Sequence, residues 1–493
     1  MYRRDFMKMT AVVSAGLLPC ISACNISSKM MTLRNRRPNI ILILTDDQGY
    51  GDLGCLGNPI LKTPNLDKLH ARSTRLTCFQ VSPTCAPTRS SLMTGRHEFK
   101  NGVTHTILER ERLCLDATTL AQMLQQSGYA TGIFGKWHLG DEDTYQPQRR
   151  GFDEVFIHGG GGIGQKYPGS CADVPPNQPH RYFDPVIRHN GDFVQTEGFC
   201  TDVFFRQAMG WIHSRRHPDQ PFFAYIATNA PHSPYIAPEA CCKPFLDQGL
   251  TSDLAGFYGM IVNIDENVGI LMNKLEQWDL EENTLILFMT DNGTALGDKV
   301  YNAGMKGKKC TSDEGGTRVP AFFCWKNHLS AGVDIAALTA QIDIFPTFAE
   351  LAGAPLPPHD QVEGRSLLPL LQNPQSKWED RFLFMHIGRW NTSREIKDFK
   401  YKGCAVRSSR FRFVNNSELY DMAVDPGQTQ NVIDLHPEVV DSMRAAYEVW
   451  WKQVCSQMVN EDASYSGQAP FEEAYERQLK STGIPAWMPF VID

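Results

Sequence analysis

The chain has 493 residues, of which 42% are hydrophobic and 21% are charged, and its formal net charge is −7. These values are typical of a folded globular enzyme, and they exclude a disordered chain and a bundle of membrane helices. The acidic balance also argues against a nucleic-acid partner, because neutralising phosphates requires a basic face. The length predicts one large α/β domain with a smaller one appended.

The N-terminal segment predicts a targeting signal rather than part of the fold. Arg3 and Arg4 precede a short apolar run, which ends in the sequence ISAC at residues 21–24. This arrangement resembles a twin-arginine export signal with a bacterial lipobox, which would leave Cys24 as a lipidated first residue. We predict a signal peptide over residues 1–23, a tether over 24–37, and export to the periplasm or cell envelope, with the lipid on Cys24 as the only membrane contact. Secretion with cleavage elsewhere and a transmembrane anchor are the alternatives.

Strands and helices alternate from residue 38 onward. Short runs typical of strands, most of them apolar on both faces, cover residues 39–45, 129–134, 222–228 and 284–290. Helices are predicted over 63–72 with Thr63 as the cap, over 116–128 with Asp116 as the cap, and over 252–278. This alternation predicts a large, mainly parallel sheet with helices on both faces.

The pattern changes near residue 378. Short strands joined by turns are predicted over 381–387, 404–414 and 418–422, and a helix follows over 437–454. We therefore expect a larger domain over 38–377 and a C-terminal subdomain over 378–493, built from a small antiparallel sheet and a helix.

Polar residues follow three of the buried strands at the point where each strand ends. Asp46 and Asp47 follow the first strand, His232 comes four residues after the third, and Asp291 and Asn292 follow the fourth. In an open parallel sheet, ligands bind at the carboxyl edge of the strands. Carboxylate and amide oxygens are the donors that calcium or magnesium prefers over zinc, so a metal site is predicted at this edge.

The stretch CAPTRSSLMTGR at residues 85–96 predicts a helix that begins at Cys85. Free backbone N–H groups and the helix dipole at such a position favour an anion. Arg89 lies one turn further along the same helix face. Taken alone, the motif would fit a buried structural cysteine and a surface arginine. The remaining cysteines form no CxxC pair, which disfavours zinc.

The whole set of motifs resembles the type I sulfatases of the alkaline phosphatase superfamily, of the bacterial exported glycan-sulfatase kind. The order of the motifs is preserved from about residue 37 to residue 434. The matching segments are TDDQGYGDLG at 45–54, CAPTRSSLMTGR at 85–96, GKWHLG at 135–140, APHSP at 230–234, TDNG at 290–293 and EGGTRVP at 314–320.

This resemblance implies an alkaline phosphatase-like fold and a modified residue 85. A separate maturase would oxidise Cys85 to formylglycine, whose hydrate is the nucleophile. Calcium would be bound by residue 85 together with the strand-end residues Asp46, Asp47, Asp291 and Asn292.

The resemblance also implies roles for the other motif residues. Arg89 would hold the hydrate and the metal-site carboxylates, and Lys136 and Lys309 would neutralise sulfate oxygens. His232 would protonate the leaving oxygen, and His138 would act as the base that regenerates the aldehyde.

One lysine is ambiguous. Lys308 stands beside Lys309, and Cys310 replaces the glycine that the family places next. Lys309 fits the family spacing better.

The implied activity is hydrolysis of sulfate esters, with O-sulfate on galactose or N-acetylgalactosamine as the expected carbohydrate substrate. A phosphate or phosphonate ester hydrolase of the same superfamily is one alternative. A non-catalytic glycan-binding lipoprotein is the other, although it would be expected to lack at least one of the motif residues.

Overall fold

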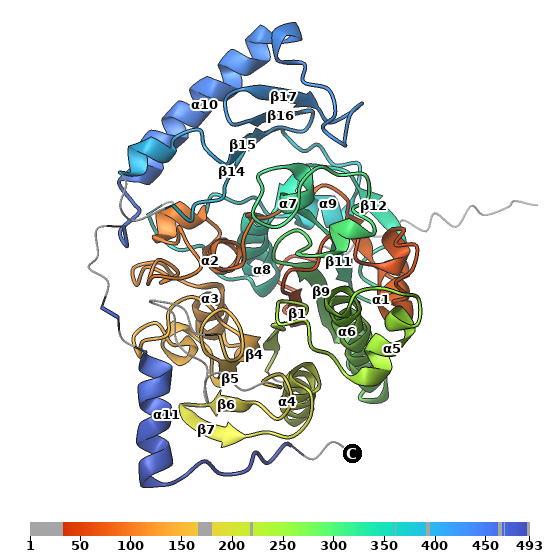
Figure 1. The fold of residues 1–493 in the computed structure, drawn as a ribbon, viewed down its shortest axis with the longest axis vertical. Coiled ribbons are helices and arrows are strands. Elements are labelled where there is room, and N and C mark those ends of the chain that lie inside the picture. Colours follow the sequence, from red (N-terminus) through yellow and green to blue (C-terminus); the bar gives the residue numbers. More distant parts are fainter. Residues whose placement is uncertain are drawn as a thin grey trace, which may run out of the picture. The chain divides into compact units, whose positions relative to one another are not determined.

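The computed structural model describes residues 33–165, 180–216, 220–359, 361–390, 395–461, 466–467 and 469–490 (Figure 1). The predicted signal peptide, Cys24 and the tether up to residue 32 lie outside these residues. Within the described part of the chain, no helix has the length and hydropathy required to cross a membrane.

A ten-stranded sheet forms the centre of the fold, in the order β12-β2-β11-β9-β1-β8-β4-β5-β6-β7. The middle strands β9, β1, β8, β4 and β5 run parallel, which confirms the predicted mainly parallel sheet. The bounds are β1 Asn39–Thr45, β2 Thr74–Leu76, β4 Ala130–Lys136, β5 Glu154–His158, β6 Val186–His189, β7 Asp192–Gln195, β8 Phe222–Ala227, β9 Thr284–Thr290, β11 Ala321–Cys324 and β12 Val333–Ile335.

Helices pack on both faces of this sheet, as predicted. One face carries α1 (Pro64–Ala71), α4 (Cys200–Ser214) and α6 (Ser252–Gln277), and the other carries α2 (Cys85–Thr94), α3 (Leu120–Gln126) and α8 (Ile344–Ala352). Three further helices are α5 (Glu239–Leu246), α7 (Glu314–Thr317) and α9 (Leu368–Gln372).

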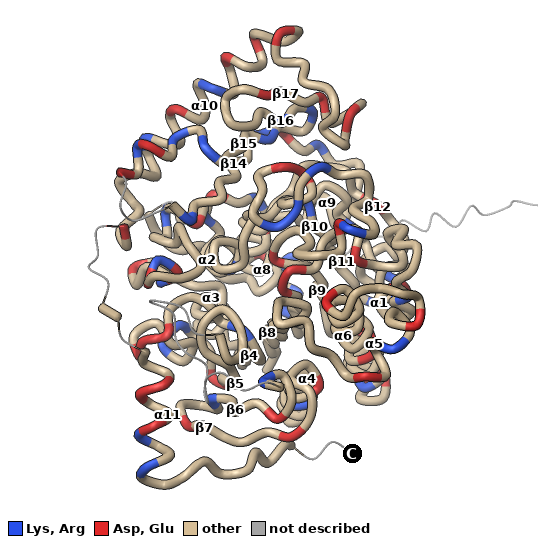
Figure 2. The backbone as a smooth tube through the Cα atoms, viewed as in Figure 1, with Lys and Arg blue, Asp and Glu red and all other residues tan. Residues whose placement is uncertain are grey.

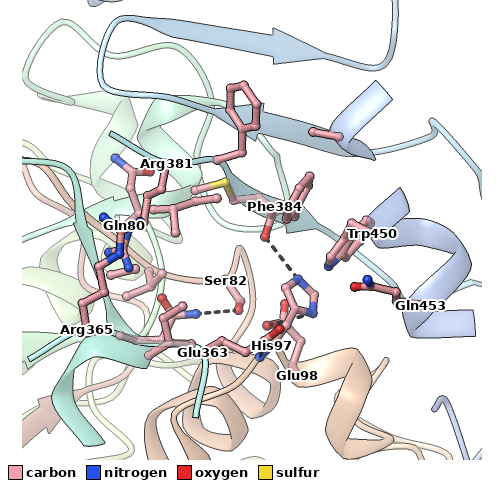
Figure 3. A pocket seen from close by; sticks show the side chains of 18 of the residues that line it. Gln80, Ser82, His97, Glu98, Glu363, Arg365, Arg381, Phe384, Trp450 and Gln453 are labelled. Atoms are coloured by element: carbon pink, nitrogen blue, oxygen red, sulfur yellow. Dashed lines mark hydrogen bonds and ion pairs between the residues drawn. The ribbon is translucent and has the colours of Figure 1, made fainter. Parts of the chain in front are cut away.

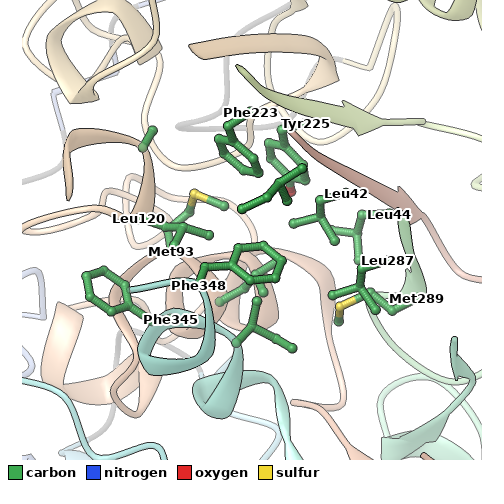
Figure 4. Packing of buried hydrophobic residues seen from close by; sticks show 14 of the residues in the cluster. Leu42, Leu44, Met93, Leu120, Phe223, Tyr225, Leu287, Met289, Phe345 and Phe348 are labelled. Carbon is green, nitrogen blue, oxygen red and sulfur yellow. The ribbon is translucent and has the colours of Figure 1, made fainter. Parts of the chain in front are cut away.

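The alternation of side chains along β1 explains why its whole sequence is apolar. Leu42 and Leu44 belong to the hydrophobic cluster on the α8 face, where Figure 4 shows them near Phe348. Ile41 and Ile43 belong to the cluster on the α6 face. A parallel strand buried on both faces has no solvent side that would need polar residues.

Two helix starts differ in detail from the expectation. Asp116 is not a cap: α3 begins at Leu120, and the Thr119 hydroxyl accepts the N–H of Gln122 while the Gln122 side chain accepts the N–H of Thr119. This reciprocal capping box is a stronger start signal than an acid four residues earlier. Thr63 does precede α1, but its hydroxyl donates to Asp67 instead of capping a backbone N–H.

A four-stranded antiparallel sheet with one long helix forms the C-terminal part. Its elements are β14 Leu383–His386, β15 Cys404–Arg407, β16 Phe411–Val414, β17 Glu418–Asp421 and α10 Pro437–Cys455. The prediction of a single strand over 404–414 is wrong, because a turn at residues 408–410 divides it into β15 and β16. Two features were not predicted: the helix α11 (Pro470–Ser481) and a small sheet of β3 (Phe79–Gln80), β10 (Arg318–Val319) and β13 (Thr339–Ala340).

Buried ion pairs join the C-terminal sheet to the EGGTRVP motif. The Glu314 carboxylate lies 3.0 Å from Arg412 Nη2 and 3.4 Å from Arg407 Nε. Burial alone would raise the pKa of Glu314, but the two guanidinium groups hold the pKa below its ordinary value. These contacts cross the predicted boundary between residues 377 and 378, which stays a prediction.

A cavity of about 490 Å³ also lies where the C-terminal sheet meets the larger domain. Figure 3 shows Trp450 of α10 beside Phe384 of β14, with His97 close by. The Trp450 and Phe384 rings stack with centroids 4.9 Å apart, and His97 Nε2 contacts the carbonyl oxygen of Phe384 at 3.1 Å. The residues that line this cavity include none of the predicted catalytic or metal-binding residues.

We predict that Glu314→Ala lowers the free energy of unfolding by about 3 to 5 kcal/mol, because it leaves Arg407 and Arg412 buried without a counter-charge. Urea denaturation followed by tryptophan fluorescence measures this change. The control is Lys243→Ala, which removes a solvent-exposed ion pair with Asp247 and should leave the midpoint unchanged. Equal midpoints for the two variants would show that the buried pairs do not stabilise the junction.

Candidate active site

The predicted site residues meet at the carboxyl edge of the central sheet. Asp46 and Asp291 follow the neighbouring strands β1 and β9, whose last residues Thr45 and Thr290 are in register. Lys136 is the last residue of β4, and Cys85 is the first residue of α2. A ligand site at this edge is expected for an open parallel sheet.

A cavity of about 110 Å³ opens above these residues. It combines residues from the sequence motifs with residues from loops that lie outside those motifs. Its lining consists of Cys85, Thr106, Ile107, His138, Gly161, Gln165, His232, Lys309 and Arg389.

Three carboxylates beneath the cavity are each paired with one cation. All six side chains are buried or nearly so. The pairs are Lys136 Nζ with Asp46 Oδ2 at 2.5 Å, Lys309 Nζ with Asp47 Oδ2 at 2.6 Å, and Arg89 Nη2 with Asp291 Oδ2 at 2.7 Å. Burying six charged groups this close together is tolerated only when each charge has a partner of opposite sign.

The acidic residues also have the features of a metal site. One ligand atom each from Asp46, Cys85 and Asp291 lies within 4.8 Å of the others. Among the described residues, Asp46 Oδ1 and Asn292 Oδ1 are buried and have no hydrogen-bond partner. Buried polar atoms are normally satisfied, so two unpaired oxygens in this acid cluster fit a cation with oxygen ligands.

The pKa values support the same interpretation. Burial raises the pKa of both Asp46 and Asp291, and the neighbouring carboxylates raise them further against the effect of Lys136 and Arg89. Burial would also raise the pKa of Asp47, but Lys309 and then His232 hold it below its ordinary value. A bound divalent cation would stabilise all three carboxylates in the ionised form.

Arg89 contacts the metal-site acid rather than residue 85. Its Nε and Nη2 atoms both donate to Asp291 Oδ2, and Nη1 donates to the carbonyl oxygen of Lys136 at 3.1 Å. Arg89 therefore positions Asp291 directly, whereas its expected contact with the hydrate remains a prediction.

Cys85 and His138 face each other inside the cavity. Cys85 Sγ lies 3.5 Å from His138 Nδ1, and the other ring nitrogen contacts the carbonyl oxygen of Thr106 at 2.8 Å. Because a carbonyl oxygen can only accept, Nε2 carries the hydrogen and the Nδ1 lone pair points at residue 85. Burial, with Lys136 nearby, lowers the pKa of His138 well below its ordinary value, so the ring is a neutral acceptor.

The backbone of Gly161 comes so close to the His138 ring that a side chain at residue 161 would not fit. A Cβ atom at Gly161 would lie 2.9 Å from His138 Cε1. Neither Thr106 nor Gly161 was selected from the sequence, although the run of glycines at 159–162 was a visible sign of close backbone approach.

His232 also lines the cavity and lies next to Asp47. Its Nε2 atom is 3.8 Å from Asp47 Oδ2. His232 Nδ1 donates to the carbonyl oxygen of Ser233 at 2.8 Å, because a carbonyl oxygen can only accept, and the amide nitrogen of Gln165 donates to the same oxygen at 2.8 Å beside the ring. Burial, followed by the charge of Lys309, lowers the pKa of His232 to about 3. No sequence pattern marked Gln165, because its partners are distant in the chain.

The structure separates the two adjacent lysines. Lys309 lines the cavity and contacts Asp47, whereas Lys308 Nζ lies 3.0 Å from Asp298 and its side chain is 42% exposed. The arrangement thus places one lysine in the site and the other at the surface, which agrees with the choice made from the motif spacing.

Together, the parallel sheet, the acid cluster at its edge and residue 85 at a helix start define an ester hydrolase of the alkaline phosphatase superfamily. Residues 38–354 match the family model described as Sulfatase, and residues 304–449 match the model described as N-sulphoglucosamine sulphohydrolase, C-terminal. The chain therefore belongs to the sulfatase family and is a sulfuric ester hydrolase.

Individual relatives cover most of the chain. It is 31% identical to N-acetylgalactosamine-6-sulfatase of Rattus norvegicus over 445 residues, which are 86% of this chain and 80% of that protein. It is 31% identical to arylsulfatase A of Homo sapiens over 455 residues, which are 83% of this chain and 87% of that protein. A crystal structure described as Ps i-CgsB in complex with k-i-k-neocarrahexaose is 28% identical, with a TM-score of 0.76 and coverage of 90% of this chain and 98% of that one.

We predict that Lys309→Ala lowers kcat/KM for an aryl sulfate by at least about a hundredfold, because it removes a buried positive charge next to the reacting group. The matched control is Lys308→Ala, which should keep turnover close to the wild-type value. Steady-state kinetics of both variants measure the difference. The opposite pattern, with Lys308→Ala inactive and Lys309→Ala active, would reverse the assignment.

Proposed function

We propose that this sulfatase depends on calcium and on oxidation of Cys85 to formylglycine, and that it removes O-sulfate from glycan sugars of the galactose or N-acetylgalactosamine type. The observation that carries the proposal is the position of Cys85. It lies at the start of a buried helix and faces both the acids Asp46 and Asp291 and the neutral ring of His138. Burial raises the pKa of the thiol, so an unmodified Cys85 would be a poor nucleophile here.

The names of related proteins support the choice of substrate. One relative is an N-acetylgalactosamine-6-sulfatase, and one similar structure is described as holding a neocarrahexaose. The first name points to a sulfated amino sugar, and the second to an oligosaccharide ligand. The maturase that would oxidise Cys85 is a separate partner.

Asp46, Asp47, Asp291 and Asn292, with residue 85, would hold the calcium, which would supply positive charge to the sulfate oxygens. A formylglycine hydrate at residue 85 would supply two hydroxyl groups on one carbon, one a nucleophile for sulfur and one whose deprotonation would release sulfate. His138 is placed to take the proton of the second hydroxyl, because its free Nδ1 faces residue 85. His232 would give a proton to the leaving oxygen of the sugar once its Nε2 atom, which carries no hydrogen in the neutral ring, has taken a proton from solvent. Lys136 and Lys309 bring positive charge to the sulfate oxygens.

We predict that residue 85 carries an aldehyde in protein co-expressed with a formylglycine-generating maturase. Mass spectrometry of the tryptic peptide that contains residue 85 should show the mass loss for conversion of CH2–SH to CHO. The aryl sulfatase activity of the same sample should fall on calcium chelation and return on addition of calcium. Cys85→Ala should abolish turnover without changing the free energy of unfolding in urea by more than about 1 kcal/mol, since it removes only one small buried group.

Two results would contradict the proposal. An unmodified thiol in the presence of an active maturase would mean that the CxPxR stretch is not a modification site, and the glycan-binding function would then be favoured. Faster hydrolysis of an aryl phosphate than of an aryl sulfate would favour the phosphate or phosphonate ester hydrolase.

We also propose that the chain is exported and anchored by a lipid on Cys24. This follows from the twin arginine at Arg3 and Arg4 and from the lipobox that ends at Cys24. In a diderm bacterium, labelled palmitate should be incorporated into the wild type but not into Cys24→Ala. Labelling of neither protein would contradict the anchor, and recovery of soluble protein from the periplasm would then indicate plain secretion.

A further inference from the structure

Arg389 lines the active-site cavity although it comes from a loop far along the chain. It shares this cavity with Cys85, His232 and Lys309, and its side chain remains exposed to solvent. Its Nη1 atom donates to the Cys310 sulfur at 3.0 Å. Arg389 therefore lies close to Lys309 in the exposed part of the cavity, which we call its mouth. We call the buried ion pairs Asp46–Lys136, Asp47–Lys309 and Asp291–Arg89 its floor.

The charge of Arg389 is not compensated in the way that the other cations of the site are. Lys309 is paired with Asp47, and the two remaining cations of the floor are also paired with acids. Among the residues that the structure describes, none forms an ion pair with Arg389. Figure 2 shows acidic and basic residues mixed along α10 and α11, and the whole chain carries a net charge of −7, so Arg389 brings positive charge to the cavity of an otherwise acidic chain.

The backbone holds Arg389 in a conformation that arginine rarely adopts. Its φ is +52°, and its N–H donates to the carbonyl oxygen of Thr104 at 2.9 Å. The preceding Gly388 packs so closely that a Cβ atom would lie 2.1 Å from the same oxygen. The following Trp390 is buried and donates to Glu461 at 2.8 Å. Left-handed backbone at a non-glycine residue costs about 1 kcal/mol or more, and such conformations gather at ligand sites.

Cys310 links Arg389 to the catalytic lysine. Its backbone N–H donates to the carbonyl oxygen of Pro83, two residues before Cys85, and its φ is +64°. Because Cys310 immediately follows Lys309, its sulfur keeps the guanidinium close to the sulfate-binding end of the cavity. Glycine at this position, as in the family pattern, could not make the contact with Arg389.

We propose that Arg389 binds a second anionic group of the substrate, a sulfate or a carboxylate carried by the same sugar or by its neighbour. This inference rests on the proposed function and deepens it: the substrate class becomes a glycan with at least two negative charges close together. A guanidinium is suited to this task, since its parallel N–H groups match the oxygens of either anion. Arg389 would select the substrate, while the buried floor performs the hydrolysis.

The test is a kinetic comparison of wild type, Arg389→Gln and Arg389→Lys on three disaccharides. All three carry the same scissile sulfate; one is otherwise neutral, one has a second sulfate, and one has a uronic carboxylate. Arg389→Gln should raise KM at least about tenfold for a doubly charged substrate, as expected for one charge-assisted hydrogen bond. The rise should be much smaller for the neutral one, with kcat little changed. Arg389→Lys should restore part of the difference.

Two matched controls separate this effect from a general loss of charge. Arg149→Gln removes an exposed arginine outside the cavity. The KM values of this variant for the three substrates should equal those of the wild type. Cys310→Gly removes the sulfur contact and should raise KM for the doubly charged substrate by less than Arg389→Gln does. The disaccharide that shows the larger dependence on Arg389 identifies the anion as a sulfate or a carboxylate.

Three outcomes would overturn the inference. Wild type could show no lower KM for either doubly charged substrate, Arg389→Gln could raise KM equally for all three, or it could lower only kcat. Failure of the proposed function has a different signature, since wild type would then release no sulfate from any sugar or aryl ester. In that case, calorimetry with the unreactive Cys85→Ala variant still measures whether Arg389→Gln weakens binding of the doubly charged sugars selectively.

Discussion

The burial of three carboxylates with three cations at one edge of the sheet is the constraint on which the site depends. The acids can remain charged there only if each cation is in place, because an unpaired buried charge would cost several kcal/mol. The partners come from β1, β4, β9, α2 and the loop before α7, so the correct pairing requires the whole sheet to be in register. A shift of β1 by one residue would move Asp46 away from Lys136, and it would move Leu42 and Leu44 from the α8 face of the sheet to the α6 face. The active-site ion pairs can therefore form only when the strands of the sheet are in the correct register.

Several non-glycine residues in and around the site have left-handed backbone, as do others elsewhere in the fold. Asp47, His138, Cys310 and Arg389 all have positive φ values. Each either lines the cavity, belongs to the acid cluster or contacts a residue that does. Strain of this kind persists only where the surrounding packing determines the backbone. The buried sheet and the two helical layers supply that packing.

The sequence predicted the parts of this structure that depend on local patterns. The strands 39–45 and 284–290 were bounded correctly, because a run of apolar residues ends where polar strand-end residues begin. Asp116 failed as a cap since an acid before a helix is a weak signal beside the Thr119 and Gln122 box. Gln165 and Thr106 were missed for a common reason: their partners lie far away in the chain, and no periodicity records such contacts. The turn at 408–410 is closed locally by Ser408 and Phe411, but the apolar residues on both sides of it resemble one continuous strand.

The division between floor and mouth explains why the reaction was easier to predict than the substrate. The floor is built from strand ends and the start of a helix, which impose fixed spacings on the chain and so produce compact motifs. The mouth is assembled from loops near residues 106, 165, 310 and 389, whose positions depend on packing across the whole chain. Loops can change side chains without disturbing the buried ion pairs, so one hydrolytic floor can serve many sugars. Cys310 connects the two levels, because it follows a lysine of the floor and contacts the arginine of the mouth.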